Sequence, residues 1–244
     1  MKVSLIIEAR SLSKRYPYKI LKICYNKKTF LEYLVTRLKK LSFVSNIIIA
    51  TTTNKIDKKI VDISKKLKVK NFKGSETNVL SRVLLAAKKY NTEIIIRVTS
   101  DCPLIDLDII YQSYQLFINN NFDYVSNGFK KTFPLGMDVE VFSYKTLKKS
   151  LKLIKDDKDR EYITAAIRKN PKEFKHCKLI APKSLNYPNF SLTLDYKEDA
   201  KLLRKIIKHF GYKNYSCLDI INFLKANKSL IKINSRLKRT KHSY

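Results

Sequence analysis

The sequence predicts an α/β protein in which helices cover both faces of a largely parallel sheet. Along the first hundred residues, short runs of β-branched residues alternate with longer amphipathic stretches, which is the pattern of repeated strand–helix units. Two of the runs, Ile47–Ile49 and Ile94–Ile96, are apolar at every position, as expected of strands that are buried on both faces. The chain of 244 residues is long enough for one large domain with a substantial core.

In the first half of the chain, strands and helices are predicted in strict alternation. The predicted strands are rich in Val, Ile and Phe, and the predicted helices place apolar residues three or four positions apart. Strands are expected at Val3–Ile7, Asn46–Ala50, Val69–Phe72 and Glu93–Val98, and helices at Lys28–Lys40, Ile56–Leu67 and Asn78–Tyr90.

After Val98 the alternation is less regular. Helices are expected at Asp106–Asn120, with Asp106 as N-cap, and at Tyr144–Ile154, Asp159–Asn170, Lys197–His209 and Cys217–Ala226. Strands are expected at Asp123–Ser126, Val139–Phe142, Phe174–Ile180 and Phe190–Leu194. No linker divides the chain, so residues 1–227 are predicted to form one domain. Residues 228–244 hold six Lys or Arg and little periodicity, which predicts a flexible, solvated, basic tail.

The net charge of +30 is typical of proteins that bind nucleic acid or anionic surfaces. The basic residues, however, are 41 Lys and 10 Arg, and they accompany many Ile, Asn and Tyr and only 4 Gly. This combination is expected when A/T-rich codons determine the composition. We therefore expect the charge to be background and the protein to have no specific nucleic-acid partner.

The cysteines and the N-terminus indicate where the protein acts. Cys24, Cys102, Cys177 and Cys217 are widely spaced and form no zinc motif, and free thiols suit a reducing cytosol. The apolar stretch Val3–Ile7 is too short for a signal peptide or a membrane span. A cytoplasmic protein without a transmembrane segment is therefore expected.

Ligands of open α/β sheets bind beyond the carboxyl ends of the strands, so the segments after the predicted strands are candidate sites. The segment after the first strand gathers four cations and a hydroxyl group, which would suit a polyphosphate. These residues are Arg10, Lys14, Arg15 and Lys19, together with Ser13. The segment has no glycine, so it is neither a P-loop nor a dinucleotide fingerprint. In a chain so rich in Lys, some of these cations could simply be solvated.

Two aspartates follow other predicted strands. Asp101 comes after Glu93–Val98, where a carboxylate could hold a divalent cation against phosphate oxygens or could cap the next helix. Asp195 follows Phe190–Leu194. The two carboxylates would face a common ion if these two strands were adjacent, and the sequence leaves that adjacency open.

The segment IIEARSLSKRYPYKIL at residues 6–21 resembles the A-R-x-x-S-x-R-x-P-x-K-x-L opening motif of the sugar cytidylyltransferases. That family includes the 3-deoxy-manno-octulosonate and acylneuraminate enzymes and the spore-coat polysaccharide (SpsF-like) members. Further blocks follow in family order over roughly residues 3–210: IIIATTTN, FKGSETNVLSR, IIRVTSDCPLID, DYVSN, FPLGMDVEVFS, DREYIT and LTLDYKEDAKLL. The resemblance implies a three-layer, Rossmann-like nucleotidyltransferase fold of GT-A-like type with a mixed, mostly parallel sheet.

The resemblance also implies a reaction and its residues. A cytidylyl group would pass from CTP to a sugar acid or related sugar, with release of pyrophosphate and with Mg²⁺ as cofactor, in surface polysaccharide or glycoconjugate biosynthesis. The matching positions for nucleotide binding are Ala9, Arg10, Ser13, Arg15, Lys19 and Arg82. Those for catalysis are Lys19, Arg10 and Asp101, and those for the metal are Asp101 and Asp195. Gly136, Asp138, Glu140 and Arg160 match positions at the acceptor sugar.

The chain departs from the family pattern in its phosphate loop. Leu12 and Tyr18 stand where the family has glycine, which predicts a reshaped loop because glycine lets backbone N–H groups approach phosphate closely. Glu8 stands where Gln or Pro is usual and adds a negative charge beside the nucleotide positions.

Two other functions remain open, as does the oligomeric state. A glycosyltransferase of the same fold type would use Asp106-Leu107-Asp108 as its metal motif, although this segment more readily caps a helix. A non-catalytic module would use the basic tail to bind nucleic acid or an anionic membrane. Relatives are commonly homodimers, and the predicted strand Val139–Phe142 with its neighbours is a candidate interface.

Overall fold

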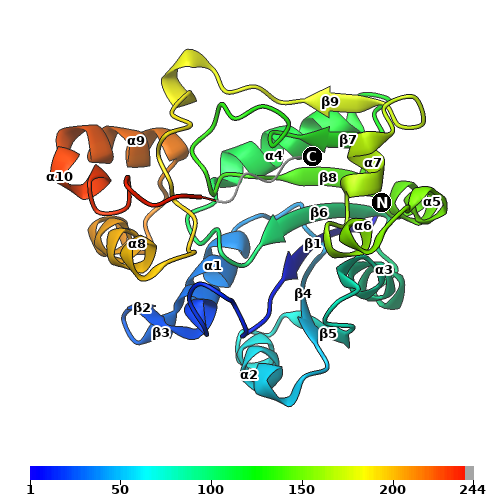
Figure 1. Cartoon of the computed structure of the whole chain (residues 1–244), viewed down its shortest axis with the longest axis horizontal. Helices are drawn as coiled ribbons and strands as arrows, with labels where there is room; N and C mark the ends of the chain where they lie inside the picture. Colours follow the sequence, from blue (N-terminus) through cyan, green and yellow to red (C-terminus); the bar gives the residue numbers. More distant parts are fainter. Residues whose placement is uncertain (240–244) are drawn as a thin grey trace.

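A seven-stranded sheet forms the centre of the computed structural model, which describes residues 1–239. The strand order is β5-β4-β1-β6-β8-β7-β9, from the bottom to the top of Figure 1. The strands are β1 (Val3–Glu8), β4 (Asn46–Thr52), β5 (Lys70–Gly74), β6 (Ile94–Thr99), β7 (Tyr124–Ser126), β8 (Glu140–Ser143) and β9 (His176–Lys178). β8 runs antiparallel to β6 and β7, whereas the other neighbouring strands are parallel. The predicted α/β fold with a mixed, mostly parallel sheet is confirmed.

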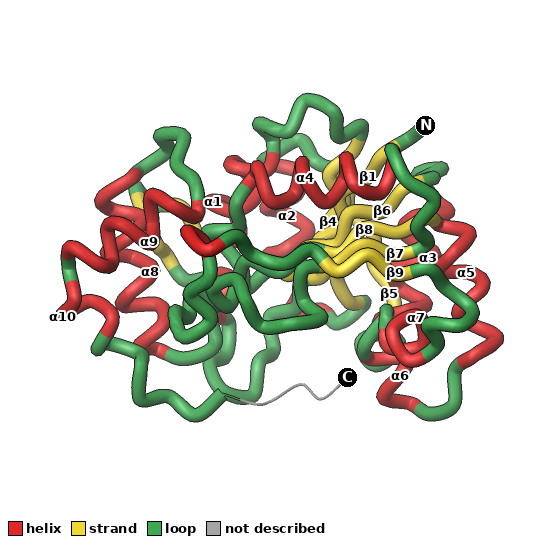
Figure 2. The backbone as a smooth tube through the Cα atoms, turned by 90° about the horizontal axis from the view of Figure 1, so that it is seen from above, coloured by secondary structure: helices red, strands yellow, loops and turns green. Residues whose placement is uncertain are grey.

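Helices cover both faces of the sheet (Figure 2). On one face lie α1 (Phe30–Leu38), α2 (Lys58–Lys66) and α4 (Leu107–Ile118), with α8 (Lys197–Phe210), α9 (Cys217–Ala226) and α10 (Lys228–Ile231) beside them. On the other lie α3 (Val79–Lys89), α5 (Tyr144–Ser150), α6 (Asp157–Glu161) and α7 (Ala165–Lys169). Ile48 and Ile95 point into one core, and Ile49 and Ile96 into the other. Successive strand residues alternate between faces, which is why these runs are apolar throughout.

Most predicted elements are confirmed to within a few residues, and the differences have local causes. The predicted helix Asp159–Asn170 is broken into α6 and α7. A hairpin of β2 (Ile23–Tyr25) and β3 (Lys28–Thr29), which the sequence pattern did not reveal, precedes α1. Its two turn residues, Asn26 and Lys27, both have positive φ (44° and 56°). A two-residue hairpin turn requires this geometry, but it is usually signalled by glycine.

Phe190–Leu194 is not a strand, so that prediction is wrong. The segment makes one isolated bridge, between Ser191 and Leu135, and the Leu194 N–H donates to the Asp101 carbonyl at 2.8 Å. Its partners are loop residues rather than a neighbouring strand, so no ladder forms. The segment nevertheless lies beside the loop that follows β6, because Leu194 is bonded to Asp101 in that loop.

The prediction of a solvated tail is wrong for residues 228–239. Lys228–Ile231 forms α10, and Leu230 and Ile233 pack against the larger core. Asn234 is buried and donates from Nδ2 to the Ser191 carbonyl at 3.0 Å. The apolar residues between the lysines are sufficient to hold this stretch against the domain. Residues 240–244 lie outside the described part of the chain.

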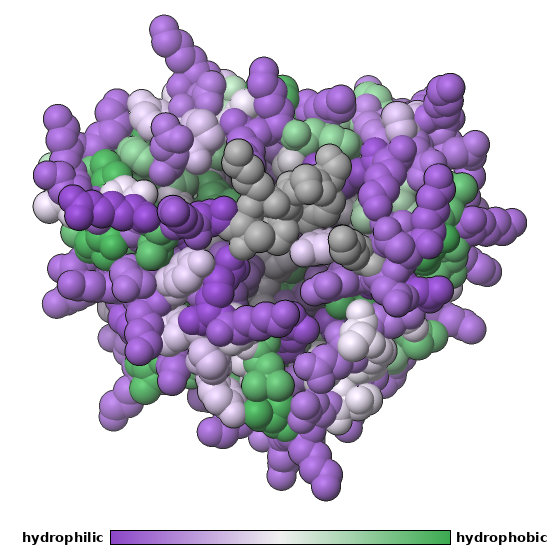
Figure 3. Space-filling view, in the orientation of Figure 1, coloured by the Kyte–Doolittle hydropathy of each residue, from purple (hydrophilic) through white to green (hydrophobic). Residues whose placement is uncertain are grey.

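Figure 3 shows hydrophilic side chains spread across the visible face, with smaller hydrophobic areas between them. Among residues 1–239, no helix combines the length and the apolar character that a bilayer crossing requires.

β8 lies between β6 and β7, and Val141 and Phe142 are fully buried. The strand Val139–Phe142 itself therefore offers no surface for a second copy, whereas a homodimer interface formed by its neighbours stays a prediction.

Candidate active site

Two loops meet at the carboxyl end of the sheet, between β1 and β6. The chain leaves β1 for β4 and β5 on one side and then returns to β6 on the other side. Such a reversal of strand order creates a crevice beyond the strand ends, where ligands of α/β proteins bind. The loop after β1 carries the predicted phosphate cations, and the loop after β6 carries Asp101.

Lys19 joins the two predicted metal aspartates. Its Nζ donates to Asp101 Oδ2 at 2.8 Å and to Asp195 Oδ1 at 3.0 Å. Burial disfavours the charged lysine, but the two carboxylates outweigh it and raise the pKa of Lys19. Burial likewise favours a neutral Asp101, but the Lys19 ammonium lowers the pKa of Asp101. The adjacency of Asp101 and Asp195, open at the level of sequence, is therefore real, and the pKa shifts of Lys19 and Asp101 both favour their charged forms.

Asp195 reaches this position because the preceding segment is bonded to the Asp101 loop. The Leu194 N–H donates to the Asp101 carbonyl at 2.8 Å, and the Thr193 hydroxyl approaches the same carbonyl at 3.4 Å. Asp195 Oδ1 also pairs with Arg15 Nη2 at 2.7 Å. Arg15, a predicted nucleotide-binding residue, is thus brought to the same carboxylate as Lys19. We name Lys19, Asp101 and Asp195 the carboxylate–lysine cluster.

A buried aspartate that the sequence did not single out holds the phosphate loop. Asp57 is 2% exposed. Its Oδ1 accepts the Ser11 N–H at 2.7 Å, and its Oδ2 accepts the Thr52 hydroxyl at 2.5 Å. The Tyr18 N–H closes the loop by donating to the Ser11 carbonyl at 2.8 Å. The start of the loop is thereby anchored to the end of β4, with Arg10 exposed to solvent.

The loop keeps a glycine-like turn without glycine. Tyr18 has φ 59° and ψ 20°, the left-handed conformation that costs a side-chain-bearing residue roughly 1–2 kcal/mol. Leu12, at the other position where the family has glycine, is not among the residues with positive φ in the described chain. Tyr18 is 39% exposed and Leu12 is 43% exposed. The backbone therefore explains the family's glycine at position 18 but not at position 12.

A buried charge network, also missed from the sequence, underlies the site. Arg97 donates from Nε and Nη2 to the two oxygens of Glu8, at 2.6 and 3.0 Å, and from Nη1 to Glu140 Oε2 at 2.6 Å. Glu140 Oε1 accepts the hydroxyls of Tyr124 at 2.5 Å and Thr164 at 2.9 Å. Although burial favours the neutral acid, Arg97 lowers the pKa of Glu140. The network ties β1, β6 and β8 together through side chains.

This network changes the interpretation of two predicted features. Both oxygens of Glu140, expected at the acceptor sugar, already accept bonds from the protein. The carboxylate of Glu8, the added negative charge, is held by Arg97 and is neutralised there. Arg97 lies within β6, and Glu8 and Glu140 stand at the ends of β1 and β8. These charged residues beside apolar runs were the signal that could have revealed the network.

Gly136, which the resemblance places at the acceptor sugar together with Asp138, lies beside the backbone of Leu192. Gly136 has φ +100°, and a Cβ there would lie 2.8 Å from the backbone carbon of Leu192, so other residues are excluded. Asp138 is exposed and accepts a long 3.4 Å bond from the Gly136 N–H. Its side chain reaches solvent on one side while protein surrounds the rest, and this partial burial, followed by the charges of Glu140 and Asp101, raises the pKa of Asp138. Asp138 therefore shares an electrostatic environment with Asp101.

Arg82 and Arg160 occupy different surroundings from the cluster. Arg82 is 2% exposed, donates to the carbonyl of Ser75, and packs on Gly74, where a Cβ would lie 2.9 Å from Arg82 Cγ. Burial lowers the pKa of Arg82, and the nearby charge of Arg10 adds to this effect. Arg160 lies on α6 with a 48% exposed side chain, 3.4 Å from Asp157. The structure does not bring Arg160 to the cluster.

The carboxylate–lysine cluster has the donor set for a magnesium ion. Mg²⁺ prefers oxygen ligands and is usually bound by one or two carboxylates together with water and substrate phosphates. Asp101 and Asp195 both direct an oxygen toward the position of Lys19 Nζ. Among residues 1–239, no group of three or more His, Cys, Asp or Glu side chains is arranged for a metal. Two carboxylates at one position fit an ion of this kind, whose remaining ligands would come from water and substrate phosphates.

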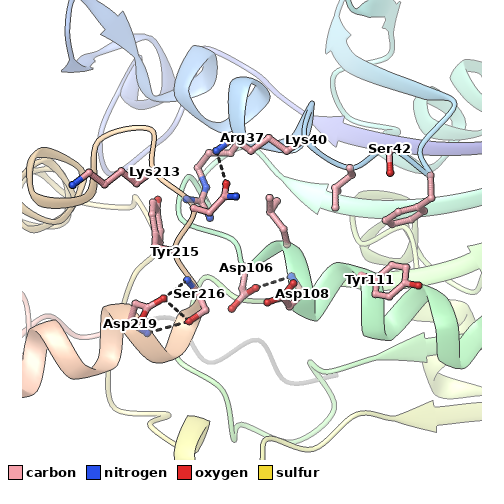
Figure 4. Close-up of a pocket in the computed structure, with 14 residues that line it drawn as sticks. Arg37, Lys40, Ser42, Asp106, Asp108, Tyr111, Lys213, Tyr215, Ser216 and Asp219 are labelled. Carbon is pink, nitrogen blue, oxygen red and sulfur yellow. Dashed lines mark hydrogen bonds between the residues drawn. The ribbon is translucent and has the colours of Figure 1, made fainter.

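A cavity of about 670 Å³ lies elsewhere, between the end of α1, the start of α4 and the loop into α9 (Figure 4). None of the residues predicted for the cytidylyltransferase site lines it, whereas Asp106 and Asp108 of the alternative metal motif do. Its charged lining residues are balanced: Arg37, Lys40 and Lys213 against Asp106, Asp108 and Asp219. Asp106 Oδ1 accepts the Asp108 N–H at 2.7 Å, and its other oxygen accepts the Cys217 N–H. Asp106 is confirmed as the N-cap of α4, so this D-x-D segment does not form a metal motif.

The fold is that of a three-layer, Rossmann-like nucleotidyltransferase. The chain matches the model of the cytidylyltransferase family over residues 4–229 and belongs to that family. It is 35% identical to a cytidylyltransferase of solved structure from Leptospira borgpetersenii, with a TM-score of 0.90 and coverage of 98% of this chain and 99% of that chain.

Two relatives are known from sequence. An uncharacterised protein of Methanocaldococcus jannaschii is 38% identical over 239 residues, which covers 98% of this chain and 97% of that protein. The spore coat polysaccharide biosynthesis protein SpsF of Bacillus subtilis is 29% identical over 231 residues, covering 91% of this chain and 93% of that protein.

Proposed function

We propose that the protein transfers a cytidylyl group from CTP to a sugar acid or a related sugar and releases pyrophosphate. The observation that carries the proposal is the convergence of Lys19, Asp101 and Asp195 at the ends of β1 and β6. Membership of the cytidylyltransferase family supports CTP as the donor. The name of the Bacillus subtilis relative supports a place in polysaccharide or glycoconjugate biosynthesis.

The cations of the phosphate loop bind the triphosphate. Lys19 has three N–H donors, two of them now used on carboxylates, and it can exchange these partners for phosphate oxygens. Arg10 is exposed in the same loop and adds a second positive charge, while Arg15 is held beside Asp195. Fixed cations of this kind stabilise the charge that develops on departing pyrophosphate. Mg²⁺ on Asp101 and Asp195 would supply further charge neutralisation.

The acceptor hydroxyl must be aligned with the α-phosphorus and must lose a proton. In-line phosphoryl-type transfer depends mainly on positioning and charge stabilisation. Asp138 is a carboxylate that reaches solvent, and the protein packed around it, together with the charges of Glu140 and Asp101, raises its pKa, which makes it a better proton acceptor. We assign it the role of orienting the acceptor hydroxyl and accepting its proton. Gly136 keeps the adjacent backbone close to Leu192.

A cytoplasmic location is part of this proposal, because CTP is a cytoplasmic substrate. All four cysteines are free thiols, as expected in a reducing compartment.

The proposal is tested by pyrophosphate release. The protein is incubated with each of four nucleoside triphosphates, Mg²⁺ and a panel of neutral and acidic sugars, and CTP with an acidic sugar should give the highest rate. Asp101→Asn should lower that rate by about 10² or more, since the metal contributes several kcal/mol. Asp108→Asn, an exposed carboxylate on α4, is the matched control and should act as wild type. Absence of pyrophosphate release across the whole panel would refute the proposal.

The two alternative functions find less support. The D-x-D segment that a glycosyltransferase would use caps a helix. The basic stretch that a binding module would use packs on the domain as far as residue 239.

A further inference from the structure

The C-terminal segment ends on the loop that carries Asp195. Arg239 donates from Nη2 to Asp199 Oδ1 at 2.6 Å and from Nη1 to Asp199 Oδ2 at 3.0 Å, a bidentate pair of the stronger kind. The Arg239 side chain is 19% exposed. Arg239 lies beyond residues 4–229, the part of the chain that the family model matches, so the family pattern assigns it no role.

Asp199 connects Arg239 to the backbone of Asp195, because its carboxylate accepts hydrogen bonds from both. It is fully buried in the first turn of α8. Its Oδ2 accepts the N–H groups of Asp195 and Tyr196, both at 2.9 Å, and its Oδ1 accepts Asn234 Nδ2 at 2.7 Å. A buried carboxylate needs such donors and a cation to remain charged. The direction of the Asp195 backbone therefore depends on a group that Arg239 neutralises.

Further contacts place the same segment beside the cluster. Arg239 Nη1 lies 4.0 Å from Asp195 Oδ2, on the carboxylate whose other oxygen pairs with Arg15 and Lys19. The Tyr196 hydroxyl donates to the Lys238 carbonyl at 3.3 Å. The end of the described chain thus holds both the carboxylate and the backbone at this turn.

We propose that Arg239 is a positioning residue of the nucleotidyl-transfer site. It holds Asp199, and through Asp199 it fixes the turn at Asp195, so that the Asp195 carboxylate faces Asp101 and Lys19 and can share a divalent cation with Asp101. This inference rests on the proposed function for its substrate. It concerns cation binding, however, which can be measured without turnover.

The test measures binding of Mn²⁺, a paramagnetic substitute for Mg²⁺, by electron paramagnetic resonance in the presence of CTP and without acceptor. Arg239→Met should weaken Mn²⁺ binding by about tenfold or more, the usual effect of removing a group that orients a metal ligand. Arg239→Lys keeps a cation near Asp199 and should recover part of the affinity. Arg236→Met is the matched control, since Arg236 is an exposed arginine of the same segment, and it should bind Mn²⁺ as wild type does.

Thermal unfolding of each variant separates positioning from general stability. Equal Mn²⁺ affinity in wild type and Arg239→Met would overturn the inference, even if the variant melts earlier. Equal loss in Arg239→Met and Arg236→Met would overturn it too, since a general charge effect would then suffice. If wild type binds Mn²⁺ with CTP, loses it in Arg239→Met and yet releases no pyrophosphate with any sugar, the inference stands and the proposed function fails.

Discussion

The proposed nucleotide side and the proposed acceptor side of the site use their charged residues differently. On the nucleotide side, Lys19, Asp101 and Asp195 contact one another in a way that phosphate and a cation can replace. On the acceptor side, Glu140 is committed to Arg97 and to two hydroxyls, while Asp138 is exposed. The difference teaches that a motif residue can be retained for the integrity of the sheet as well as for contact with substrate.

Arg97→Met tests whether Glu140 serves the integrity of the sheet, and it should have the largest effect on stability of the substitutions considered. The substitution removes the cation that holds Glu8 and, within the described chain, leaves Glu140 paired with a cation only through the longer 3.7 Å contact to Arg168, which should lower the free energy of unfolding by about 3–5 kcal/mol. Urea unfolding measures this loss. Arg160→Met, an exposed arginine on α6, is the control and should change stability by less than about 0.5 kcal/mol. A stable Arg97→Met variant with reduced activity would assign the network to catalysis instead.

Acid should weaken the charge network of Arg97, Glu8 and Glu140 and thereby lower the stability of the fold. The pKa of Glu140 is lowered from its ordinary 4.5, so the unfolded chain binds a proton more readily than the folded protein does. The stabilisation is therefore complete above pH 4.5 and is lost as the pH falls through the folded pKa. Urea unfolding between pH 7 and pH 3 should show this decline, and Glu140→Gln should flatten it. An unchanged slope in the variant would contradict the assignment.

The contribution of Asp138 to folding stability should change with pH in the opposite direction to that of Glu140. Its pKa is raised from an ordinary 3.8, so its contribution favours folding below that value and is lost as the pH rises through the folded pKa. Asp138→Asn should therefore increase stability at neutral pH while lowering activity, and the same urea experiments together with a rate measurement would detect both changes. Lower stability at pH 7 would show that Asp138 has a structural partner.

The smallest predicted effect concerns the phosphate loop. Tyr18→Gly relieves the left-handed conformation, but glycine also gains entropy in the unfolded chain, so the net stabilisation should be about 0.5–1 kcal/mol. Leu12→Gly, at a position without positive φ, should give no gain. Thermal unfolding of both variants makes the comparison. Equal effects at the two positions would mean that the strain at Tyr18 is absent in solution.

The fold was largely predictable because its signals are local. Ile48 and Ile49 show a strand buried on both faces, and Asp106 precedes its helix as a cap should. The hairpin at Asn26 and Lys27 was missed because its turn lacks glycine. The C-terminal segment was misjudged because its lysines outweighed the apolar residues that bury it.

The sequence named the residues of the candidate site, but it did not reveal their contacts. The resemblance identified Lys19, Asp101 and Asp195, whereas their convergence depends on a backbone bond from Leu194 to Asp101 that no periodicity reveals. Asp57 and Arg97 act through partners far away in the sequence, so their roles required the fold. Glu140 was placed at the acceptor by its motif, and the fold shows that its oxygens are engaged by the protein.

The central claim is that Asp101 and Asp195 act as one unit with Lys19. A double-mutant cycle of Asp101→Asn and Asp195→Asn, read as kcat/KM for CTP-dependent pyrophosphate release, tests it most directly. Residues that hold one ion lose their function together, so the double variant should be about as slow as the slower single variant. If the loss of kcat/KM in the double variant equals the product of the two single losses, the two carboxylates act independently, and that result would contradict the account.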